Sequence, residues 1–542
     1  MYKTRSPQAQ HYLEGSPHIN ELDVFNQIRK SKKPKSGVPG DLPRTLMQEF
    51  APELAGPLSR IYRNVVDTGE WPSAWHLEHG IPLQKNPNPK NEDDLRVISL
   101  TAFYSKVLER FVMDWLLEHI GHLIDWHQYG GQKGTSVSHY LIDFVNFVLY
   151  NQNLKNIHAV LAATVDFSKA FNRQNHNLLI TLLSELGVPG WLLRIVIGFL
   201  QNRELEVKYK GVTTDRFKLP GGGPQGTILG MFLFLILINA AGFREAVKNT
   251  GQIITKQRKR EAIEKIHLKF IDDMTAAEAI NVKEKLVPNP NPNPERPLGY
   301  HERTGHVLGE GQSEVQALLA ELKDYTEEHE MKINTDKCKV MLFNTSKTYD
   351  FLPKIGIEED DPFQVVDELR LLGVMITSNL SWQTQVDYMC KRAFARVWMI
   401  RRLKPLGATN DELMEVYRTQ IRCLLEFAVA VWNSGLTKAQ INQIERVQKC
   451  VLAVILDSEY LSYNHALEVM STDTLSDRRH NLCFKFAVKA QKHEKFSNWF
   501  SPYDHLGMDT RSKKDALKPV QARTNRFAKS PIAYLTDLLN QK

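Results

Sequence analysis

Two adjacent acids, Asp272 and Asp273, interrupt a strand-like run, "HLKFIDDMTAA", at residues 267–277. Like charges repel, and a half-buried carboxylate must be paired, solvated or bound to a metal. Taken alone, the pair is explained by a turn at a hairpin tip, where acids are common for backbone reasons. A third acid, Asp166, ends another strand-like stretch, "AATV". We therefore expect three carboxylates at the ends of two neighbouring strands of one sheet, a cluster that is unstable unless cations fill it.

The chemistry suited to such a cluster is phosphoryl transfer. Two Mg²⁺ ions held about 3.5 to 4 Å apart by carboxylates support in-line displacement, because one ion activates the attacking oxygen and the other stabilises the leaving group. The stretch "PGGGPQG" (220–226) offers backbone that approaches a base or sugar closely and leads into a helix N-terminus. Lys85 and Arg96 flank a polar loop and could clasp a triphosphate, although most single Lys and Arg side chains are simply solvated.

The elements that must position these residues are predicted from hydrophobic periodicity. Residues 22–120 are mainly helical in pattern, interrupted by a strand, a polar loop and a second strand within "HGIPLQKNPNPKNEDDLRVISLT". "HAVLAATVDFSKAF" predicts a strand that ends on Asp166, and a helix is expected over 175–186. "LEVKYKGVTTDRFKLP" and "KIHLKFIDDMTAAEAI" predict hairpins. The apolar run 228–242 predicts a buried helix, since it is shorter than the roughly 18 to 20 residues that cross a bilayer.

The second half of the chain changes from mixed to helical. "PNPNPNPERPLG" (288–299) predicts an exposed linker loop, because its alternating prolines remove backbone donors. A helix over 314–329, a strand "KCKVMLF" and a second strand "LRLLGVMIT" are expected next. From Thr384 onward the pattern predicts helices only.

Charge and cysteine content narrow the class of protein. The net charge is +7, and much of it lies in three basic stretches that are typical of a polyanion-binding protein but equally of a solvated surface, namely Arg29–Lys35, Lys256–Arg260 and Arg511–Lys529. The five cysteines are odd in number and lack a C-x-x-C pair, which argues against a disulfide framework and a zinc module. With a polar N-terminus, the sequence predicts an intracellular protein without a signal peptide or membrane partner, and it does not distinguish nucleus from cytoplasm.

Five segments in order resemble the palm motifs of reverse transcriptases: "VDFSKAFN", "GGGPQGTILG", "FIDD", "NTDKCKVMLF" and "LRLLGVMI". "KSGVPGDLP", "DLRVISLTAFYSKVLERF" and "HQYGGQKGTSVSH" resemble the fingers of the non-LTR retrotransposon branch. "QINQIERVQKCVLAVI" and "SPIAYLTDLLN" resemble the segments C-terminal to the palm in that branch. An ordered set is far more specific than any one motif.

This resemblance implies an α+β fold with right-hand polymerase architecture. We expect fingers, a palm with an antiparallel sheet, a helical thumb and a helical, basic C-terminal extension. The implied boundaries are a flexible N-terminal tail (1–20), fingers with the first palm elements (21–158), the palm with a disordered insertion near 281–312 (159–380), the thumb (381–458) and the extension (459–542).

The implied activity is that of an RNA-directed DNA polymerase, which copies an RNA template from a DNA or RNA primer with dNTPs. Two Mg²⁺ ions are its implied cofactors, and Mn²⁺ can substitute. No endonuclease-like segment precedes the fingers and no Cys/His knuckle is present at the C-terminus, so we expect any target nicking to need an endonuclease supplied in trans or by a longer polyprotein. Template, host and oligomeric state stay open.

The resemblance also implies roles for single residues. Asp166 and Asp272 would bind both metals with support from Asp273, and Lys337 would be the general acid for the leaving pyrophosphate. Phe171 would be a gate against a ribose 2′-hydroxyl. The other implied contacts are nucleotide binding by Lys85, Arg96, Phe167, Gln225 and Gly226, a primer grip at Gly373, and tracking of the nucleic-acid backbone by Arg392, Arg396, Arg401 and Arg402.

Two residues depart from the family pattern, Asn172 where Asp is usual and Ile271 where Ala is more frequent. Neither removes a metal ligand, but both allow lowered activity. One alternative is therefore a decayed or domesticated copy that binds nucleic acid without polymerising. An RNA-dependent RNA polymerase is a third hypothesis, against which Phe171 argues.

Overall fold

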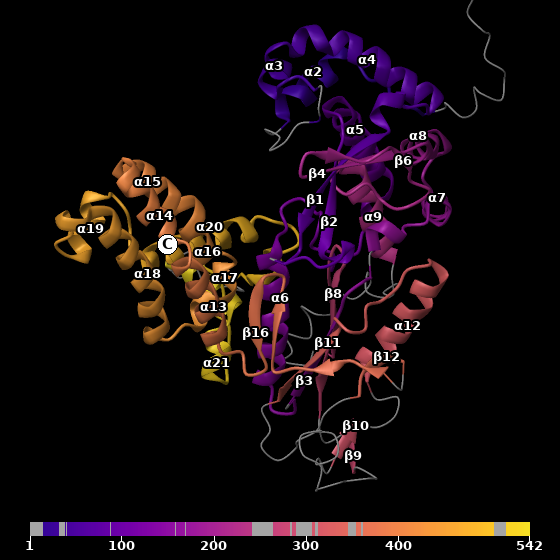
Figure 1. Ribbon diagram of the computed structural model, residues 1–542. Coiled ribbons are helices and arrows are strands. Elements are labelled where there is room, and N and C mark those ends of the chain that lie inside the picture. The colour runs from indigo at the N-terminus through magenta and orange to yellow at the C-terminus, as the bar shows by residue number, and fades with distance from the viewer. Residues whose placement is uncertain are drawn as a thin grey trace, which may run out of the picture. The chain divides into compact units, whose positions relative to one another are not determined.

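The computed structural model describes residues 15–31, 38, 41–86, 88–157, 159–168, 170–240, 264–281, 285–288, 306–308, 313–344, 354–358, 361–502 and 516–541. The chain forms two compact units that alternate along the sequence, and Figure 1 labels their helices and strands. The first unit comprises Met1–Asp125, Phe167–Arg244 and Leu322–Ile333, and the second comprises Trp126–Asp166, Glu245–Glu321 and Asn334–Lys542.

A five-stranded sheet and a set of helices make up the first unit. The expected strand, loop and strand are confirmed as the antiparallel pair β1 (Leu77–Gln84) and β2 (Leu95–Leu100). β4 (Glu204–Tyr209) runs parallel to β1 and forms the expected hairpin with β5 (Val212–Thr213), while β6 (Phe217–Lys218) also pairs with β4. The helices are α2 (Glu21–Lys30), α3 (Arg44–Glu49), α4 (Ala51–Thr68), α5 (Phe103–Ile120), α7 (His176–Glu185), α8 (Gly190–Leu200) and α9 (Ile228–Ala240).

The second unit contains a sheet with the strand order β14-β11-β3-β8-β7. β3 (Ala159–Val165) is central and pairs antiparallel with β8 (Asp273–Ile280) and β11 (Lys339–Asn344). β7 (Lys265–Phe270) forms the expected hairpin with β8, and the short β14 (Gln364–Val365) runs parallel to β11. Small and β-branched side chains let β3 be buried on both faces, and α6 (Val137–Asn153) packs on β3 and β7.

The expected single strand "LRLLGVMIT" is wrong, because the segment forms a hairpin. β15 (Glu368–Leu371) pairs with β16 (Val374–Thr377) around a two-residue turn. Leu372 and Gly373 both have positive φ, at 46° and 91°, which is the geometry of the tight turns that match the twist of a hairpin. A glycine within an apolar, strand-like pattern was the available signal for this turn.

The rest of the second unit is mainly helical, as the pattern after Thr384 predicts. No strand occurs after residue 384 in the described part of the chain, and α12 (Glu314–Glu328) confirms the expected helix before it. These C-terminal helices are α13 (Gln383–Phe394), α14 (Val397–Leu403), α15 (Asn410–Val416), α16 (Cys423–Glu426), α17 (Val429–Trp432), α18 (Lys438–Leu456), α19 (Tyr463–Val469), α20 (Leu475–Gln491), α21 (Asn525–Ala528) and α22 (Pro531–Asn540).

Two further short ladders are β9 (Leu286–Pro288) with β10 (His306–Leu308), and β12 (Gly356–Glu358) with β13 (Asp361–Pro362). Pro288, the first residue of the expected linker loop, therefore ends β9, and the remainder of that loop lies outside the described residues. The basic stretch Lys256–Arg260 and most of Arg29–Lys35 lie outside them as well. Among the described helices, none has the length and apolar character that crossing a bilayer requires, and α9 is a buried core helix.

Candidate functional site

The acids lie at one edge of the β3–β8 pair, as the sequence predicts. Val165 is opposite Met274, so Asp166, one residue beyond β3, and Asp273, the first residue of β8, flank the same end of the ladder. Phe270 pairs with Asp273, which leaves Ile271 and Asp272 as a two-residue turn between β7 and β8. The positions of these acids are therefore fixed by strand register.

The turn holds an unusual backbone conformation. Ile271 has a φ of 59°, which is costly for a β-branched residue. Its amide donates to Oε1 of Gln128 at 3.0 Å, and the same oxygen accepts from the amide of Gly130 at 2.9 Å. Gln128 is fully buried and bridges to Lys269 of β7. One glutamine side chain thus connects the segment "HQYGG" to the turn that carries Asp272.

Gly130 is required by the same contact. A Cβ at this position would lie 2.5 Å from both the backbone nitrogen and Cγ1 of Ile271, closer than real Cβ atoms come. Sequence reasoning placed this glycine only within a motif and missed its role, as it missed Gln128. The sequence signal that could have found them is the glutamine that stands two residues before a Gly-Gly pair in the segment that precedes helix α6.

Lys337 meets Asp166 on the other side of the site. Its Nζ lies 3.3 Å from Asp166 Oδ2. The turn that carries Lys337 is tied to the end of β3, since the amide of Asn334 donates to the carbonyl of Asp166 at 2.8 Å. Behind it, the amide of Asp166 contacts Cys338 Sγ at 3.4 Å, and burial, more than the nearby carboxylate, raises the pKa of the Cys338 thiol to about 11. Cys338 is therefore a neutral packing residue.

A cavity of about 450 Å³ joins these groups to the β15–β16 hairpin. Asp166, Asp273 and Lys337 line it from the sheet, and residues 368–372 line it from the hairpin. Gly373 lies in the hairpin turn itself, where a Cβ would meet the ring of Phe427 at 3.1 Å. The hairpin that carries Gly373 and two of the three expected acids thus share one cavity, whereas Gly373 itself and Asp272 are not among its lining residues.

The donor set at this cavity fits a hard divalent cation. Aspartate oxygens are the ligands that Mg²⁺ prefers, and Asp166 Oδ2 is buried yet accepts no hydrogen bond from the described residues, having only the ion pair with Lys337. The oxygens of Asp166, Asp272 and Asp273 do not form a group within 4.8 Å in the described structure. The residues therefore suit a metal, and the geometry does not fix the number of ions.

Phe171 and the glycine-rich loop are assembled within the first unit. The amide of Gly223 donates to the carbonyl of Phe171 at 2.7 Å, and that of Gly222 donates to Gln174 at 2.9 Å. The half-buried Phe171 ring packs on Phe234 of α9, with centroids 3.9 Å apart. The loop and the expected sugar gate thus form one local structure. The side chain of Asn172 lies outside the described residues.

The end of the glycine-rich loop is fixed to β2. The carbonyl of Gln225 accepts from the amide of Ser99 at 2.6 Å, and a Cβ on Gly226 would lie 2.4 Å from the Ser99 oxygen. α9 then begins at a buried carboxylate, because Glu109 Oε2 accepts from the amides of Ile228 at 2.7 Å and Leu229 at 3.2 Å. Glu109 was missed by sequence reasoning, since it lies more than a hundred residues from the helix it caps.

The remaining expected nucleotide contacts, Lys85, Arg96 and Phe167, lie in different environments, two of them exposed and one buried. Lys85 and Arg96 are exposed, and the β1–β2 ladder ends beside them, with the Lys85 amide donating to Asp94 at 2.8 Å. Phe167 is 6% exposed and bridges to Ile333, so its ring is part of the packing of the first unit.

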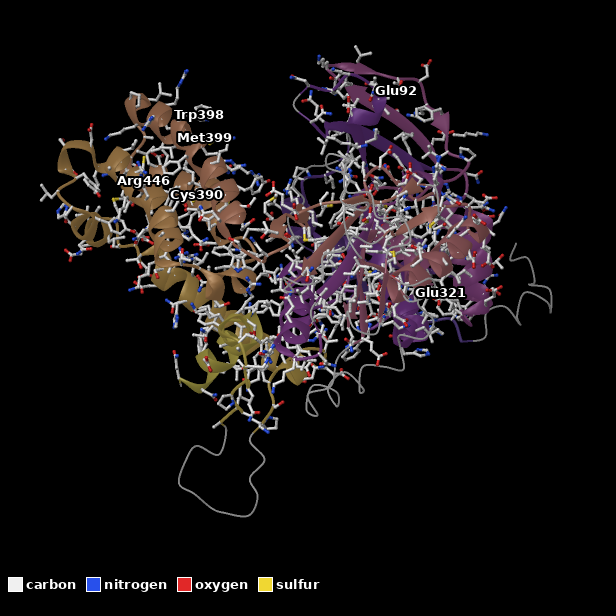
Figure 2. The ribbon with its side chains drawn as sticks, turned by 90° about the horizontal axis from the view of Figure 1, so that it is seen from below. Glu92, Glu321, Cys390, Trp398, Met399 and Arg446 are labelled. Carbon is white, nitrogen blue, oxygen red and sulfur yellow. The ribbon has the colours of Figure 1, made fainter. Side chains whose placement is uncertain are left out.

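The expected backbone-tracking arginines lie on α13, on α14 and between them. Arg392 Nη1 donates to the hydroxyl of Tyr388 at 3.2 Å, and Arg396 Nη1 donates to the Gln420 carbonyl at 2.6 Å. Arg401 and Arg402 are exposed. Between these positions Trp398, labelled in Figure 2, is 56% exposed, which adds an aromatic surface to the basic one.

This sheet, with acids at adjacent strand ends, carries the motifs of a template-directed polymerase. Residues 87–286 match the family described as reverse transcriptase (RNA-dependent DNA polymerase). Among curated proteins, the RNA-directed DNA polymerase from mobile element jockey of Drosophila melanogaster is 28% identical over 242 residues, covering 42% of this chain and 26% of that protein. Its counterpart from Drosophila funebris is 20% identical over 483 residues, covering 87% and 48%.

The chain spans less than half the length of these relatives. Among solved structures, telomerase from Candida tropicalis with a telomeric RNA fragment has a TM-score of 0.37 at 11% identity, covering 78% of this chain and 68% of that one. Telomerase from Candida albicans has a TM-score of 0.33 at 12% identity, covering 81% and 67%. The chain carries a reverse transcriptase domain of the non-LTR retrotransposon type, as its motifs predict. Members of this family generally depend on divalent metal ions.

Proposed function

We propose that this chain is an RNA-directed DNA polymerase whose chemical step occurs at the cavity lined by Asp166 and Asp273. One observation supports this most directly. Two carboxylates at adjacent strand ends, a lysine amine 3.3 Å from one of them and a hairpin share one cavity. Packing of the sheet alone does not explain why strand register fixes two acids at this end of the β3–β8 ladder, with Asp166 half-buried and Asp273 exposed.

Asp166, Asp272 and Asp273 would hold the divalent metal, two Mg²⁺ ions by family likeness, with Mn²⁺ as a substitute. The bound metal supplies Lewis-acid activation of the primer 3′-oxygen and neutralises charge on the leaving pyrophosphate. Lys337 carries the proton that the pyrophosphate oxygen takes up as it leaves, because its amine lies at the carboxylate and reaches the same cavity. The Ile271–Asp272 turn, held by Gln128, sets the position of the acid at its second residue.

The partners are inferred from the same assignment. The substrates are an RNA template, a DNA or RNA primer and dNTPs. Lys85 and Arg96 receive the triphosphate, Gln225 and Gly226 lie beside the new base pair, and Phe171 stands under the sugar. The hairpin turn at Gly373 and the arginines of α13 and α14 hold the primer and template backbone, for which Arg supplies forked donors.

Primer extension on poly-rA/oligo-dT with dTTP and Mg²⁺ tests this proposal. Wild type should extend, and Asp272→Asn should abolish incorporation while duplex affinity stays within a few-fold, because the acids position metal rather than hold the backbone. Asp336→Asn is the matched control, since Asp336 lines the same cavity without a proposed role. Near-normal extension by Asp272→Asn would remove the metal assignment.

The same assay separates the rival functions. A domesticated binder would retain duplex affinity without extending in wild type. An RNA polymerase would prefer UTP to dTTP on the same template.

A further inference from the structure

A second cavity, of about 750 Å³, lies wholly within the second unit and shares no lining residue with the acid cavity. It is bordered by α6, by the segment C-terminal to α20 and by the residues around α21. Its volume lies in the range of small-molecule sites, about 300 to 1,000 Å³. No step of the polymerase chemistry uses it.

Six aromatic side chains contribute to its walls, and Asp143 holds two of them, Tyr129 and Trp499, in place. The Asp143 carboxylate accepts from Trp499 Nε1 at 2.8 Å and from the hydroxyl of Tyr129. Burial raises the pKa of Asp143. Lys495 Nζ lies 3.7 Å from the centroid of the Tyr129 ring. The aromatic residues that line the cavity are Trp126, Tyr129, Phe147, Tyr150, Trp499 and Phe527.

Asn146, which is only 8% exposed, and Asn498 both line this cavity. Asn498 Oδ1 is buried without a hydrogen-bond partner among the described residues. Buried polar groups are almost always paired, so an unpaired amide oxygen in the lining of a cavity indicates a ligand that supplies the partner. An asparagine amide presents a donor and an acceptor side by side, which matches the edge of a nucleobase.

The charges around the cavity suit a phosphate-bearing ligand. Lys155 and Lys518 are exposed members of the lining. Arg523 also lines it, but its guanidinium is engaged with the carbonyls of Asn153 at 2.6 Å and Leu154 at 3.1 Å, where it closes the C-terminus of α6. Arg523 is therefore structural, and the two lysines are available to a phosphate.

We propose that this cavity binds an unstacked base of single-stranded RNA, with the aromatic walls stacking on the base, Asn146 reading its edge and Lys155 and Lys518 meeting the adjacent phosphates. Single-stranded RNA is recognised in this way, by bases splayed onto aromatic side chains and bonded along their edges. The choice of RNA over another ligand rests on the proposed function. The site would select a feature of the template RNA outside the segment being copied.

The experiment compares full-length wild type with Asn146→Leu, which keeps side-chain volume and removes the amide. Affinities for labelled single-stranded rA, rC and rU 12-mers are measured by fluorescence anisotropy. We expect wild type to prefer one base, and Asn146→Leu to lose about tenfold for that base while the three affinities converge, the size of one base-edge contact. Asn442→Ala, an exposed amide of α18 outside the cavity, is the matched control and should change nothing.

Two measurements keep this test decisive. If Asn146→Leu folds poorly, Asn498→Ala serves in its place, and we expect it to reduce the same base preference. In wild type, crosslinks from RNA that contains 4-thiouridine should map to peptides that carry Trp126 or Trp499. Unchanged base preference in both variants, or crosslinks confined to other peptides, overturns the proposal. Binding of labelled AMP, but not of RNA, that depends on Asn146 also overturns it.

Extension on poly-rA/oligo-dT distinguishes this result from failure of the proposed function. Asn146→Leu should extend a saturating primer–template at the wild-type rate. A wild type that binds RNA through Asn146 without extending would contradict the polymerase proposal and leave the binding site in place.

Discussion

A single glycine, Gly130, and a strained isoleucine, Ile271, decide where the turn that carries Asp272 lies. Ile271 has a left-handed backbone that its β-branched side chain disfavours, and the amide acceptor of Gln128 compensates part of that strain. The departure from the family pattern at Ile271 therefore has a physical counterpart in the structure. Strain at a functional turn persists only when its surroundings over-determine it, which here means Gln128 and Gly130.

Gly130→Ala tests this dependence. Its new Cβ would lie 2.5 Å from the Ile271 nitrogen, so the turn must shift and carry Asp272 with it. A displacement of about 1 Å at a reactive centre costs on the order of a hundredfold in rate, which is the loss we expect in single-turnover extension. Gly121→Ala is the control, because its Cβ would meet only Leu117 at 3.6 Å. Equal rates for the two variants would contradict the assigned role of Gly130.

Phe171→Ala tests the sugar gate. The ring is fixed by Phe234 and bounded by Gly223, so a 2′-hydroxyl placed over it would have to occupy ring volume or displace the triphosphate. We expect the ratio of kcat/KM for dTTP to that for UTP to fall in the variant, measured on one template. A ratio that does not fall, or a wild type that prefers UTP, would mean that Phe171 is no gate.

Among the elements, those with a local cause were predictable from sequence. The β7–β8 hairpin is predicted by an alternating pattern around two acids, and the β1–β2 pair by two apolar runs around a polar loop. The sequence predicted one strand over "LRLLGVMIT" because the segment is almost continuously apolar, and the turn at its single glycine, which divides it into β15 and β16, was missed. The roles of Gln128 and Glu109 were missed for another reason, since each depends on a contact that only the folded chain creates.

The cap of α9 gives a prediction about an element. Glu109 is fully buried and accepts from two helix amides and from Ser105 Oγ at 3.0 Å. Glu109→Ala would leave these donors unsatisfied, and we expect the first denaturant-unfolding transition to lose about 2 to 3 kcal/mol. Glu109→Gln, which keeps an acceptor, should lose less. Glu118→Ala, an exposed acid of α5, serves as the control, and an equal loss there would refute the cap.

At the scale of the whole molecule, stability should depend on pH through His139. Burial, and then electrostatic interaction with His493 and Lys495, lowers the pKa of His139 to about 3. The folded chain keeps this ring neutral while the unfolded chain binds a proton below about pH 6.5, so folding weakens as pH falls from 6.5 toward 3.

His139→Phe keeps the stacking on Phe496, where the centroids are 4.0 Å apart, and removes the titration. The loss of unfolding free energy between pH 7 and pH 5 should then be smaller than in wild type by about 2 kcal/mol. The raised pKa of Asp143 has the opposite effect, since it stabilises the folded chain as the pH falls. Asp143 is present in both proteins, so its contribution cancels in the difference. Parallel pH profiles for the two proteins would exclude His139 as the cause.

The last prediction, also at the scale of the whole molecule, concerns the C-terminal basic stretch Arg511–Lys529. The chain carries +7, and its C-terminal basic stretch is the largest contributor that sequence alone identifies. Each lost phosphate contact flattens the slope of log K against log salt by just under one unit, because fewer counterions are released on binding. We expect glutamine at Arg511, Lys513, Lys514 and Lys518 to weaken RNA–DNA binding more at low salt than at high salt and to flatten that slope.

A change in net charge alone would not flatten the slope, since the number of counterions released depends on the number of phosphate contacts rather than on the total charge. A control with the same four-charge change therefore separates the two explanations. It places glutamine at exposed basic residues of the first unit that have no proposed contact with nucleic acid, namely Arg60, Arg110, Lys208 and Lys210. If the tail variant and the control have the same slope, the stretch is a solvated surface, and the polyanion must be held by the arginines of α13 and α14 instead.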